Sequence, residues 1–215
     1  YIPMELKITR GTIRTNPVPY YGMVDKNIGY IAISTFAIEG CSKDIKKALI
    51  ELKQQGATSI VLDLRGNGGG LLSEAVNVVN FFVPKGKEIV VTKGKIKQAG
   101  STYKTSNEPI DMEIPLTVLV DGATASAAEI VSGSLQDLDR AVIVGNRTYG
   151  KGLVQVPREL PYNSSMKVTT AKYYIPSGRC IQAIDYAKRN ADGSVARIPD
   201  SLTTVSVSYT HLRAH

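Results

Sequence analysis

Runs of apolar residues separated by polar stretches predict a series of buried strands. The clearest run is Ser59–Leu64, which is apolar on both faces for most of its length. That pattern is typical of a parallel strand that is covered on two sides. Three further runs predict buried strands, at Ile28–Ile33, Leu116–Val120 and Ala141–Val144.

Apolar residues at helical spacing lie between these runs. The first helix is predicted to begin near Ser42, a suitable N-cap, and to end at Gly56; its buried face would hold Ile45, Ala48, Leu49 and Leu52. A second helix is predicted over about Leu71–Phe82, and a third begins at Ala127. Strand, helix and strand alternate, so the fold class is predicted to be α/β.

Three stretches of the chain have a different pattern from this alternation: the N-terminal end, residues 85–106 and the C-terminal part. Residues 1–15 predict an extended segment, which Asn16–Pro19 breaks with two prolines. Residues 85–106 are polar and predict strands with turns. From Val154 onward the pattern is mostly β, and its clearest strand is Val168–Ile175. A β-rich C-terminal part is therefore expected to follow the α/β core.

Composition narrows the function classes. With 215 residues, 43% of them hydrophobic and 21% charged, the chain is long enough for one sizeable globular domain. The net charge of +7 comes from scattered Lys and Arg, and with three Phe and no Trp no stacking platform stands out, so nucleic acid is not an expected partner. Cys41 and Cys180 have no metal-ligand spacing; free thiols are expected, although a bridge between them stays open.

The termini need separate treatment. No run of 18 apolar residues and no signal peptide is present, but the chain opens in mid-strand at Tyr1, so it is expected to be a piece of a longer protein. Val207–Leu212 matches one reading frame of a transposon-end sequencing adapter, and we hypothesise that residues 207–215 are not native. Both histidines, His211 and His215, lie in this tail, which leaves the remaining chain without histidine.

The first candidate for chemistry is the glycine loop Gly66–Gly70, between a predicted strand and a predicted helix. Such a loop exposes backbone N–H groups beside a helix N-terminus and can bind a phosphate or a developing oxyanion. The dinucleotide fingerprint would need a glycine where Leu71 stands. A tight turn with positive φ is the structural alternative.

The second candidate is Gly145–Gly152, which nearly fits the phosphate-binding P-loop. Gly152 stands where a P-loop needs Ser or Thr, and a strand rather than a helix is predicted to follow. Lys151 lies between two glycines, which indicates that something approaches its backbone closely.

The third candidate is Ser126, which has small neighbours and lies at the start of a predicted helix. The amide of Ala127 would point outward there, as an oxyanion donor must; the alternative is that Ser126 is only an N-cap. A serine nucleophile needs a base, and without histidine Lys151 is the remaining candidate. A lysine acts as a base only when it is neutral, so a dry pocket is required. If the following segment is extended, Gln155 faces the same side and could orient the amine.

These residues resemble a known family. Val120–Ile130 (Val-Asp-Gly-Ala-Thr-Ala-Ser-Ala-Ala-Glu-Ile) and Gly150–Gln155 (Gly-Lys-Gly-Leu-Val-Gln) are similar to motifs of the C-terminal processing peptidases, also called tail-specific proteases, of family S41. Asp63–Gly70 and Ile28–Ile31 resemble them too, in the family's order, and the resemblance covers roughly residues 10–185. Ala128 is a departure, because a second serine is common there.

The resemblance implies a role for each site residue. It makes Ser126 the nucleophile, Lys151 the general base and Gln155 the residue that supports the lysine. The oxyanion hole would combine the amide of Ala127 with that of Gly68 or Gly69. No cofactor or metal is expected.

The resemblance also implies a domain organisation and a setting. Residues 13–206 would form a crotonase/ClpP-like spiral core with a β-rich C-terminal part, and residues 1–12 would be the end of a truncated PDZ domain. The family cleaves exported proteins near apolar C-terminal tails, so the bacterial periplasm or cell envelope is the expected location. Membrane association through an absent N-terminal part and assembly into a homo-oligomer stay open.

Two other hypotheses compete with the peptidase. The first is a catalytically silent relative that binds peptide tails and lacks a neutral Lys151. The second is a nucleotide-binding enzyme that uses the loops at 66–70 and 145–152.

Overall fold

The computed structural model describes residue 7, residue 11 and the ranges 15–95 and 100–197. The proposed non-native tail at 207–215 lies outside the described residues. So do the expected extended segment at 1–15 and the PDZ remnant at 1–12, apart from Lys7, Gly11 and Thr15.

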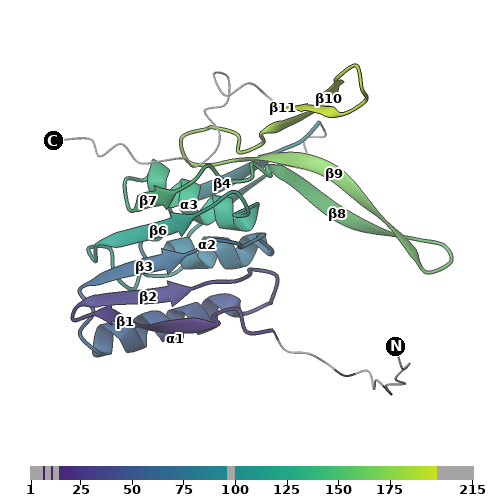
Figure 1. The fold of residues 1–215 in the computed structure, drawn as a ribbon. Coiled ribbons are helices and arrows are strands. Elements are labelled where there is room, and N and C mark those ends of the chain that lie inside the picture. Colours follow the sequence, from purple (N-terminus) through teal and green to yellow (C-terminus); the bar gives the residue numbers. More distant parts are fainter. Residues whose placement is uncertain (1–6, 8–10, 12–14, 96–99, 198–215) are drawn as a thin grey trace.

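A five-stranded sheet forms the body of the protein, in the order β1-β2-β3-β6-β7 (Figure 1). Its strands are β1 (Tyr20–Asp25), β2 (Ile28–Ala32), β3 (Ser59–Asp63), β6 (Leu116–Val120) and β7 (Val142–Gly145). β1 pairs antiparallel with β2, whereas the other neighbouring pairs are parallel. The α/β prediction is therefore confirmed, and β1 is a strand that the sequence pattern did not reveal.

Three helices cover one face of this sheet: α1 (Cys41–Gln54), α2 (Leu72–Asn80) and α3 (Ala127–Asp137) (Figure 1). The core between them is apolar and includes the fully buried side chains of Ile31, Ile45, Leu49, Leu62, Phe82 and Ile130. Burying such side chains stabilises the fold by about 1.5–3 kcal/mol each.

The start of α1 differs from the prediction. The N-cap is Gly40, with a φ of 82°, and Ser42 is a buried residue of the first turn. The carboxylate of Glu74, on α2, accepts the amide hydrogens of Gly40 at 2.9 Å and Ser42 at 2.8 Å. Because a neighbouring helix satisfies these first-turn donors, α1 needs no capping side chain of its own.

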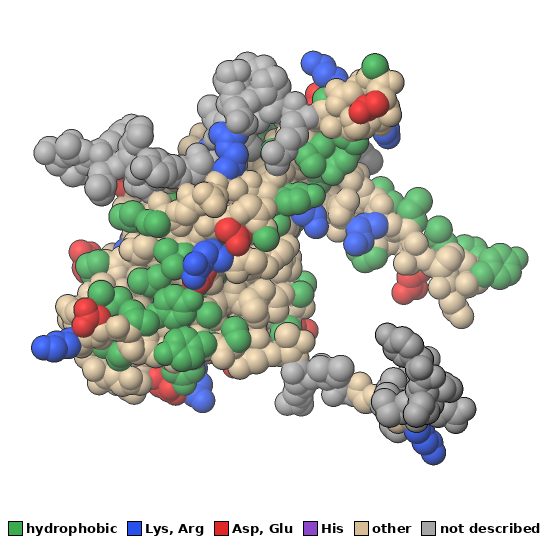
Figure 2. Space-filling model, in the orientation of Figure 1, with side chains coloured by type: hydrophobic (Ala, Val, Ile, Leu, Met, Phe, Trp, Pro, Cys, Tyr) green, Lys and Arg blue, Asp and Glu red, His purple; other side chains and the backbone are tan. Residues whose placement is uncertain are grey.

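The other face of the sheet is open within the described residues. Tyr20 and Val24 on β1 and Val142 and Val144 on β7 are each between 39% and 56% exposed. Figure 2 shows apolar side chains gathered over this face. β3 pairs in parallel with both neighbours, as predicted. It was also expected to be buried on both faces of the sheet, but the described helices cover only one face (Figure 1).

A second sheet has the order β5-β4-β9-β8, and its strand β4 contacts α2 and α3. Its strands are β4 (Glu88–Lys93), β5 (Ser101–Lys104), β8 (Leu153–Leu160) and β9 (Ser164–Tyr174). β8 and β9 continue beyond the body as a long arm, with the fully exposed Tyr162 at its turn (Figure 1). A short sheet of β10 (Ile184–Arg189) and β11 (Val195–Arg197) completes the predicted β-rich part.

Two smaller expectations concern the cysteines and the membrane. Cys41 is buried, Cys180 is half-buried, and both are free thiols. Burial, together with the nearby charge of Glu74, raises the pKa of the Cys41 thiol to about 12, so this group is unreactive at neutral pH. None of the described helices has the length and apolar character needed to cross a membrane.

Candidate active site

The glycine loop and the Ser126 turn meet at the carboxyl ends of two adjacent parallel strands. The glycine loop follows β3 and the Ser126 turn follows β6, so both leave the sheet at the same edge. The amide of Ala125 donates to the carbonyl oxygen of Asn67 at 2.9 Å, and the hydroxyl of Thr124 donates to that of Leu64 at 2.8 Å. These bonds fix the serine turn directly against the glycine loop.

Asp121 is the second link between the two loops. Its carboxylate accepts hydrogen bonds from the amides of Gly66, Ala123 and Thr124, each at 3.0 Å. Burial alone would raise the pKa of Asp121, but these bonds to the ionised form outweigh it and leave the pKa lowered. The carboxylate is therefore charged at neutral pH, and its hydrogen bonds join the glycine loop to the Ser126 turn.

Gly69 explains why the loop is rich in glycine. It has a φ of +93°, and a Cβ atom there would lie 2.6 Å from the carbonyl oxygen of Ala125 and 2.8 Å from the amide nitrogen of Ala127. Only glycine permits this approach and this backbone conformation. The loop is thus required both as a turn and as a close neighbour of the serine.

Each of the two loops has one backbone amide that is a candidate for an oxyanion hole. Within the described residues, the N–H groups of Ala127 and of the exposed Gly68 make no hydrogen bond. The amide of Gly69, by contrast, already donates to the side-chain oxygen of Asn67 at 2.9 Å. Of the two glycines named from the sequence, Gly68 has the available donor.

Ser126 lies at the N-cap of α3 in an unusual backbone conformation, with φ 57° and ψ −117°. Non-glycine residues rarely adopt such angles, and where they persist the surrounding contacts enforce them, often at functional sites. Here the enforcing contact is the Ser126 amide, which donates to Oε2 of Glu129 at 2.7 Å. Ser126 is half-exposed, so its hydroxyl can be reached from outside.

Glu129 joins the serine to the lysine. It is fully buried, and Oε2 accepts the amide hydrogens of both Ser126 and Lys151, the latter at 2.8 Å. Oε1 accepts the amide of Gly150 at 2.6 Å and the hydroxyl of Thr148 at 2.7 Å. Two backbones far apart in sequence therefore lie side by side on one oxygen atom.

Burial raises the pKa of Glu129, although its four hydrogen bonds oppose that shift. Sequence reasoning gave Glu129 no role. A usable signal was present, because an acidic residue three positions after an N-cap serine is the capping-box pattern, which places its carboxylate at the serine amide.

The side chains of Lys151 and Gln155 have fewer contacts than the Ser126 turn. Both side chains are exposed, and the Lys151 ammonium makes no hydrogen bond or ion pair with another described residue. The dry surroundings expected for Lys151 are thus not supplied by the described part of the chain. Leu153 and Gln155 line one cavity of about 490 Å³, whereas Lys151 precedes β8 and does not line it, so the face predicted for Lys151 and Gln155 together stays a prediction.

The P-loop alternative fails on the structure. Gly152 is followed by strand β8 and not by a helix whose N-terminus could hold a phosphate. The close approach that the two glycines indicated is made by the chain itself, because residues 182 and 183 pack against Gly150 and Gly152.

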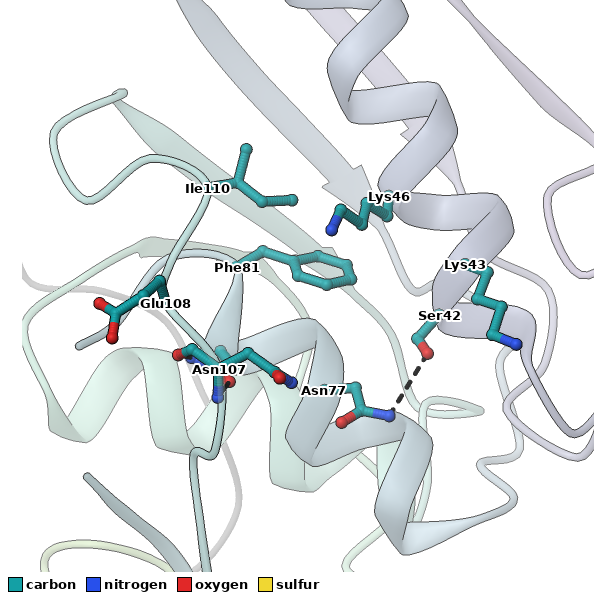
Figure 3. A pocket seen from close by; sticks show the side chains of 9 residues that line it. Ser42, Lys43, Lys46, Asn77, Phe81, Asn107, Glu108 and Ile110 are labelled. Carbon is teal, nitrogen blue, oxygen red and sulfur yellow. Dashed lines mark hydrogen bonds between the residues drawn. The ribbon is translucent and has the colours of Figure 1, made fainter. Parts of the chain in front are cut away.

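A second hollow, of about 240 Å³, lies between α1, α2 and the segment at 107–110 (Figure 3). Figure 3 shows the side chains of Lys46, Phe81 and Asn107 around it, and the amide of Asn77 bonded to the hydroxyl of Ser42. None of the predicted site residues lines it. Among the described residues, no three His, Cys, Asp or Glu side chains gather in an arrangement that could hold a metal ion.

Comparison with known proteins gives a consistent result. Residues 27–187 match Peptidase family S41. The chain is 39% identical over 188 residues to a carboxy-terminal-processing protease of Bartonella bacilliformis, covering 85% of this chain and 42% of that protein. It is 41% identical over 174 residues to a carboxyl-terminal-processing protease of Picosynechococcus, covering 80% and 41%.

A solved structure supports the same relationship. The photosystem II D1 C-terminal processing protease superposes with a TM-score of 0.65 at 38% identity, covering 72% of this chain and 39% of that one. The chain thus spans about two-fifths of the length of these relatives.

Proposed function

Since the chain belongs to peptidase family S41, we propose that it carries the catalytic centre of a serine endopeptidase, with Ser126 as nucleophile and Lys151 as general base. One observation carries this proposal: Oε2 of Glu129 accepts the amides of both residues, at 2.7 and 2.8 Å. A serine and a lysine that share a buried anchor are held as neighbours.

The proposed reaction is acyl transfer through a covalent intermediate. The neutral amine of Lys151 takes the proton of the Ser126 hydroxyl while Oγ attacks the carbonyl carbon of the scissile peptide bond. The amides of Gly68 and Ala127 bind the oxyanion. The protonated lysine then gives its proton to the leaving amine, and water, deprotonated in turn by the lysine, hydrolyses the acyl-enzyme. Gln155 orients the amine without adding charge.

The lysine must be shielded from water to act as a base. In the described part of the chain its side chain is exposed. The relatives are more than twice as long as the stretch that they share with this chain. We therefore propose that a segment of the longer protein, or the substrate itself, covers Lys151 when the site is active.

The wider assignment follows the relatives, which are named carboxy-terminal-processing proteases. We propose a crotonase/ClpP-like spiral core at residues 13–206, preceded by a PDZ domain whose end is residues 1–12, and a non-native tail at 207–215. Exported proteins with apolar C-termini are the proposed substrates, and the periplasm or cell envelope is the proposed location. A homo-oligomer and membrane association through an N-terminal part remain part of this hypothesis.

The test is cleavage of peptides with apolar C-termini by the full-length protein and its variants. Ser126→Ala and Lys151→Met are expected to lower kcat/KM by at least about 10³-fold, because each removes one member of the reacting pair. Lys85→Met, at an exposed lysine whose ion pair among the described residues is with Glu108, is the matched control and should keep full activity. Unchanged cleavage by Ser126→Ala would rule out this serine as nucleophile.

A catalytically silent peptide-binding protein is the second candidate, and the exposure of Lys151 favours it. It predicts that the same peptides bind with equal affinity to the wild-type protein and to Ser126→Ala, and that neither protein cleaves them. A covalent adduct of Ser126 with a fluorophosphonate probe would contradict this alternative, because only an activated hydroxyl forms it.

A further inference from the structure

The segment Gln182–Ala183 holds the backbone on both sides of Lys151. The amide of Gly152 donates to Oε1 of Gln182 at 2.8 Å, and the amide of Ala183 donates to the carbonyl oxygen of Gly150 at 2.9 Å. On the basis of the proposed function, we propose that Gln182 is a positioning residue that sets Lys151 against Ser126.

Gln182 suits this task through its own hydrogen bonding. Its side chain is only 4% exposed, and while Oε1 accepts from Gly152, Nε2 donates to the carbonyl oxygen of Ile184 at 3.0 Å. A neutral amide is the group that can accept and donate at the same time in this buried place. It holds the backbone next to Lys151 without adding a charge.

The fit between the two segments leaves no space for larger residues. A Cβ atom on Gly150 would lie 2.3 Å from Cβ of Ala183, and one on Gly152 would lie 2.4 Å from the amide nitrogen of Gln182. Both distances are far below van der Waals contact, so the glycines are required by the segment that presses on them. The backbone of Lys151 is consequently confined from two directions.

The residues that lead into Gln182–Ala183 are bonded to α3, the helix whose N-cap is Ser126. Arg179 donates through Nη2 to Oδ1 of Asp137 at 2.8 Å and to Oε1 of Gln136 at 2.7 Å. The amide of Ser177 donates to Oδ2 of Asp137 at 3.0 Å. These bonds fix the turn that leads into Gln182.

The same helix therefore reaches Lys151 by two routes. At its N-terminal end Glu129 holds the lysine amide directly. At its C-terminal end Asp137 acts through Arg179 and the segment that contains Gln182. Because proton transfer needs the amine within hydrogen-bond reach of the serine hydroxyl, a small displacement of this backbone is costly.

The first variant for the test is Gln182→Met in the full-length protein, which keeps the volume and removes both hydrogen bonds. We expect kcat to fall by about 10- to 100-fold, with KM changed less than about twofold, since a misplaced base slows the chemical step and leaves substrate binding intact. A purely structural role would instead lower the amount of folded enzyme and leave kcat per active site, titrated with a fluorophosphonate, unchanged. That result would overturn the inference.

A second pair of variants tests the close packing of Ala183 against Gly150, independently of the side-chain amide of Gln182. Gly150→Ala is expected to lower kcat at least as much as Gln182→Met, because its new methyl group meets Ala183. Adding Ala183→Gly removes the closest contact and should recover part of the lost kcat, although the positive φ of 82° at position 150 still disfavours alanine. A folded double variant whose kcat does not recover would contradict the proposed confinement of the Lys151 backbone.

The outcomes also separate this inference from the proposed function. If Ser126→Ala and Lys151→Met keep their activity, the proposed peptidase centre is wrong. If those two variants lose activity while Gln182→Met keeps the wild-type kcat, the peptidase centre stands and only the role of Gln182 fails.

Discussion

The two halves of the candidate site, which we name for the proposed roles of Ser126 as nucleophile and Lys151 as base, are built in different ways. The nucleophile half consists of the glycine loop and the Ser126 turn, which are bonded to each other at a sheet edge. The base half consists of Lys151 and Gln155, both exposed, on a segment that enters the second sheet. The first half is complete within the described residues, whereas the second has a fixed backbone and uncovered side chains.

This difference shows what a parallel sheet supplies by itself. Adjacent strands β3 and β6 end at the same edge, so their following loops meet without further instruction. The proposed base, Lys151, lies on a later segment, and hydrogen bonds from its backbone and that of Gly152 to Glu129 and Gln182 hold this segment near the same edge. Substitutions in the first half should therefore lower stability and catalytic activity together. Substitutions in the second half should lower catalytic activity more than stability.

Among substitutions that leave the proposed reacting side chains in place, the largest effect is expected from Gly69→Ala, in the nucleophile half. The added methyl group would lie within 2.8 Å of Ala127 and requires a φ of +93°, so the loop must move away from the serine. We expect kcat/KM to fall by at least about 10²-fold and the free energy of unfolding by about 1–3 kcal/mol.

Gly66→Ala is the matched control, because φ is also positive there but no atom lies within 4 Å of the added Cβ. It should lose about 1 kcal/mol of stability from the backbone strain alone and retain most of the activity. Equal losses in the two variants, measured by urea unfolding and peptide cleavage, would show that loop contact with the serine is unimportant.

The next effect concerns Glu129, where the two halves meet. Glu129→Gln replaces one acceptor oxygen by an NH₂ group that faces backbone N–H donors, so at least one buried bond is lost. We expect about 1–3 kcal/mol lower stability together with reduced kcat. Glu113→Gln, at an exposed carboxylate, should change neither quantity. Wild-type kcat in a folded Glu129→Gln protein would mean that the shared anchor does not position the pair.

The smallest effect is a pH dependence in the nucleophile half. The pKa of Asp121 is lowered on folding, so its charge stabilises the protein above the unfolded-state pKa of about 3.9, and this contribution disappears as the pH falls through the folded-state pKa. Asp121→Asn is expected to cost about 1 kcal/mol at pH 7 and progressively less in acid. Urea unfolding of both proteins at several pH values between 2 and 7 measures this, and a difference that does not shrink in acid would contradict it.

The strands and helices with strong apolar patterns could be predicted from the sequence. The strand at Leu116–Val120 has the predicted bounds, and the helix predicted at Leu71–Phe82 extends over Leu72–Asn80. The N-cap of α1 could not be predicted, because Glu74 on another helix satisfies its first amides. β1 was missed because Tyr20–Asp25 is half-exposed and lacks a regular alternation.

The site shows the same limit. Ser126 and the loop that contains Gly68 were identified from local patterns, and the structure brings them together. The choice between Gly68 and Gly69 required the structure, since it depends on which amide Asn67 already occupies. Gln182 gave no local signal at all, because its role exists only through a contact with Gly152, 30 positions earlier in the chain.

The backbone at position 151 is held through its own amide and through the two glycines beside it, and not through the side chain of Lys151. These contacts consequently do not depend on the side chain at this position, so it can be replaced without loss of the bonds that hold the backbone. Evolution or a protein engineer can exchange the chemical group there without rebuilding the scaffold. Lineages that abandon the lysine for a different reactive group, or for none, would keep the same architecture.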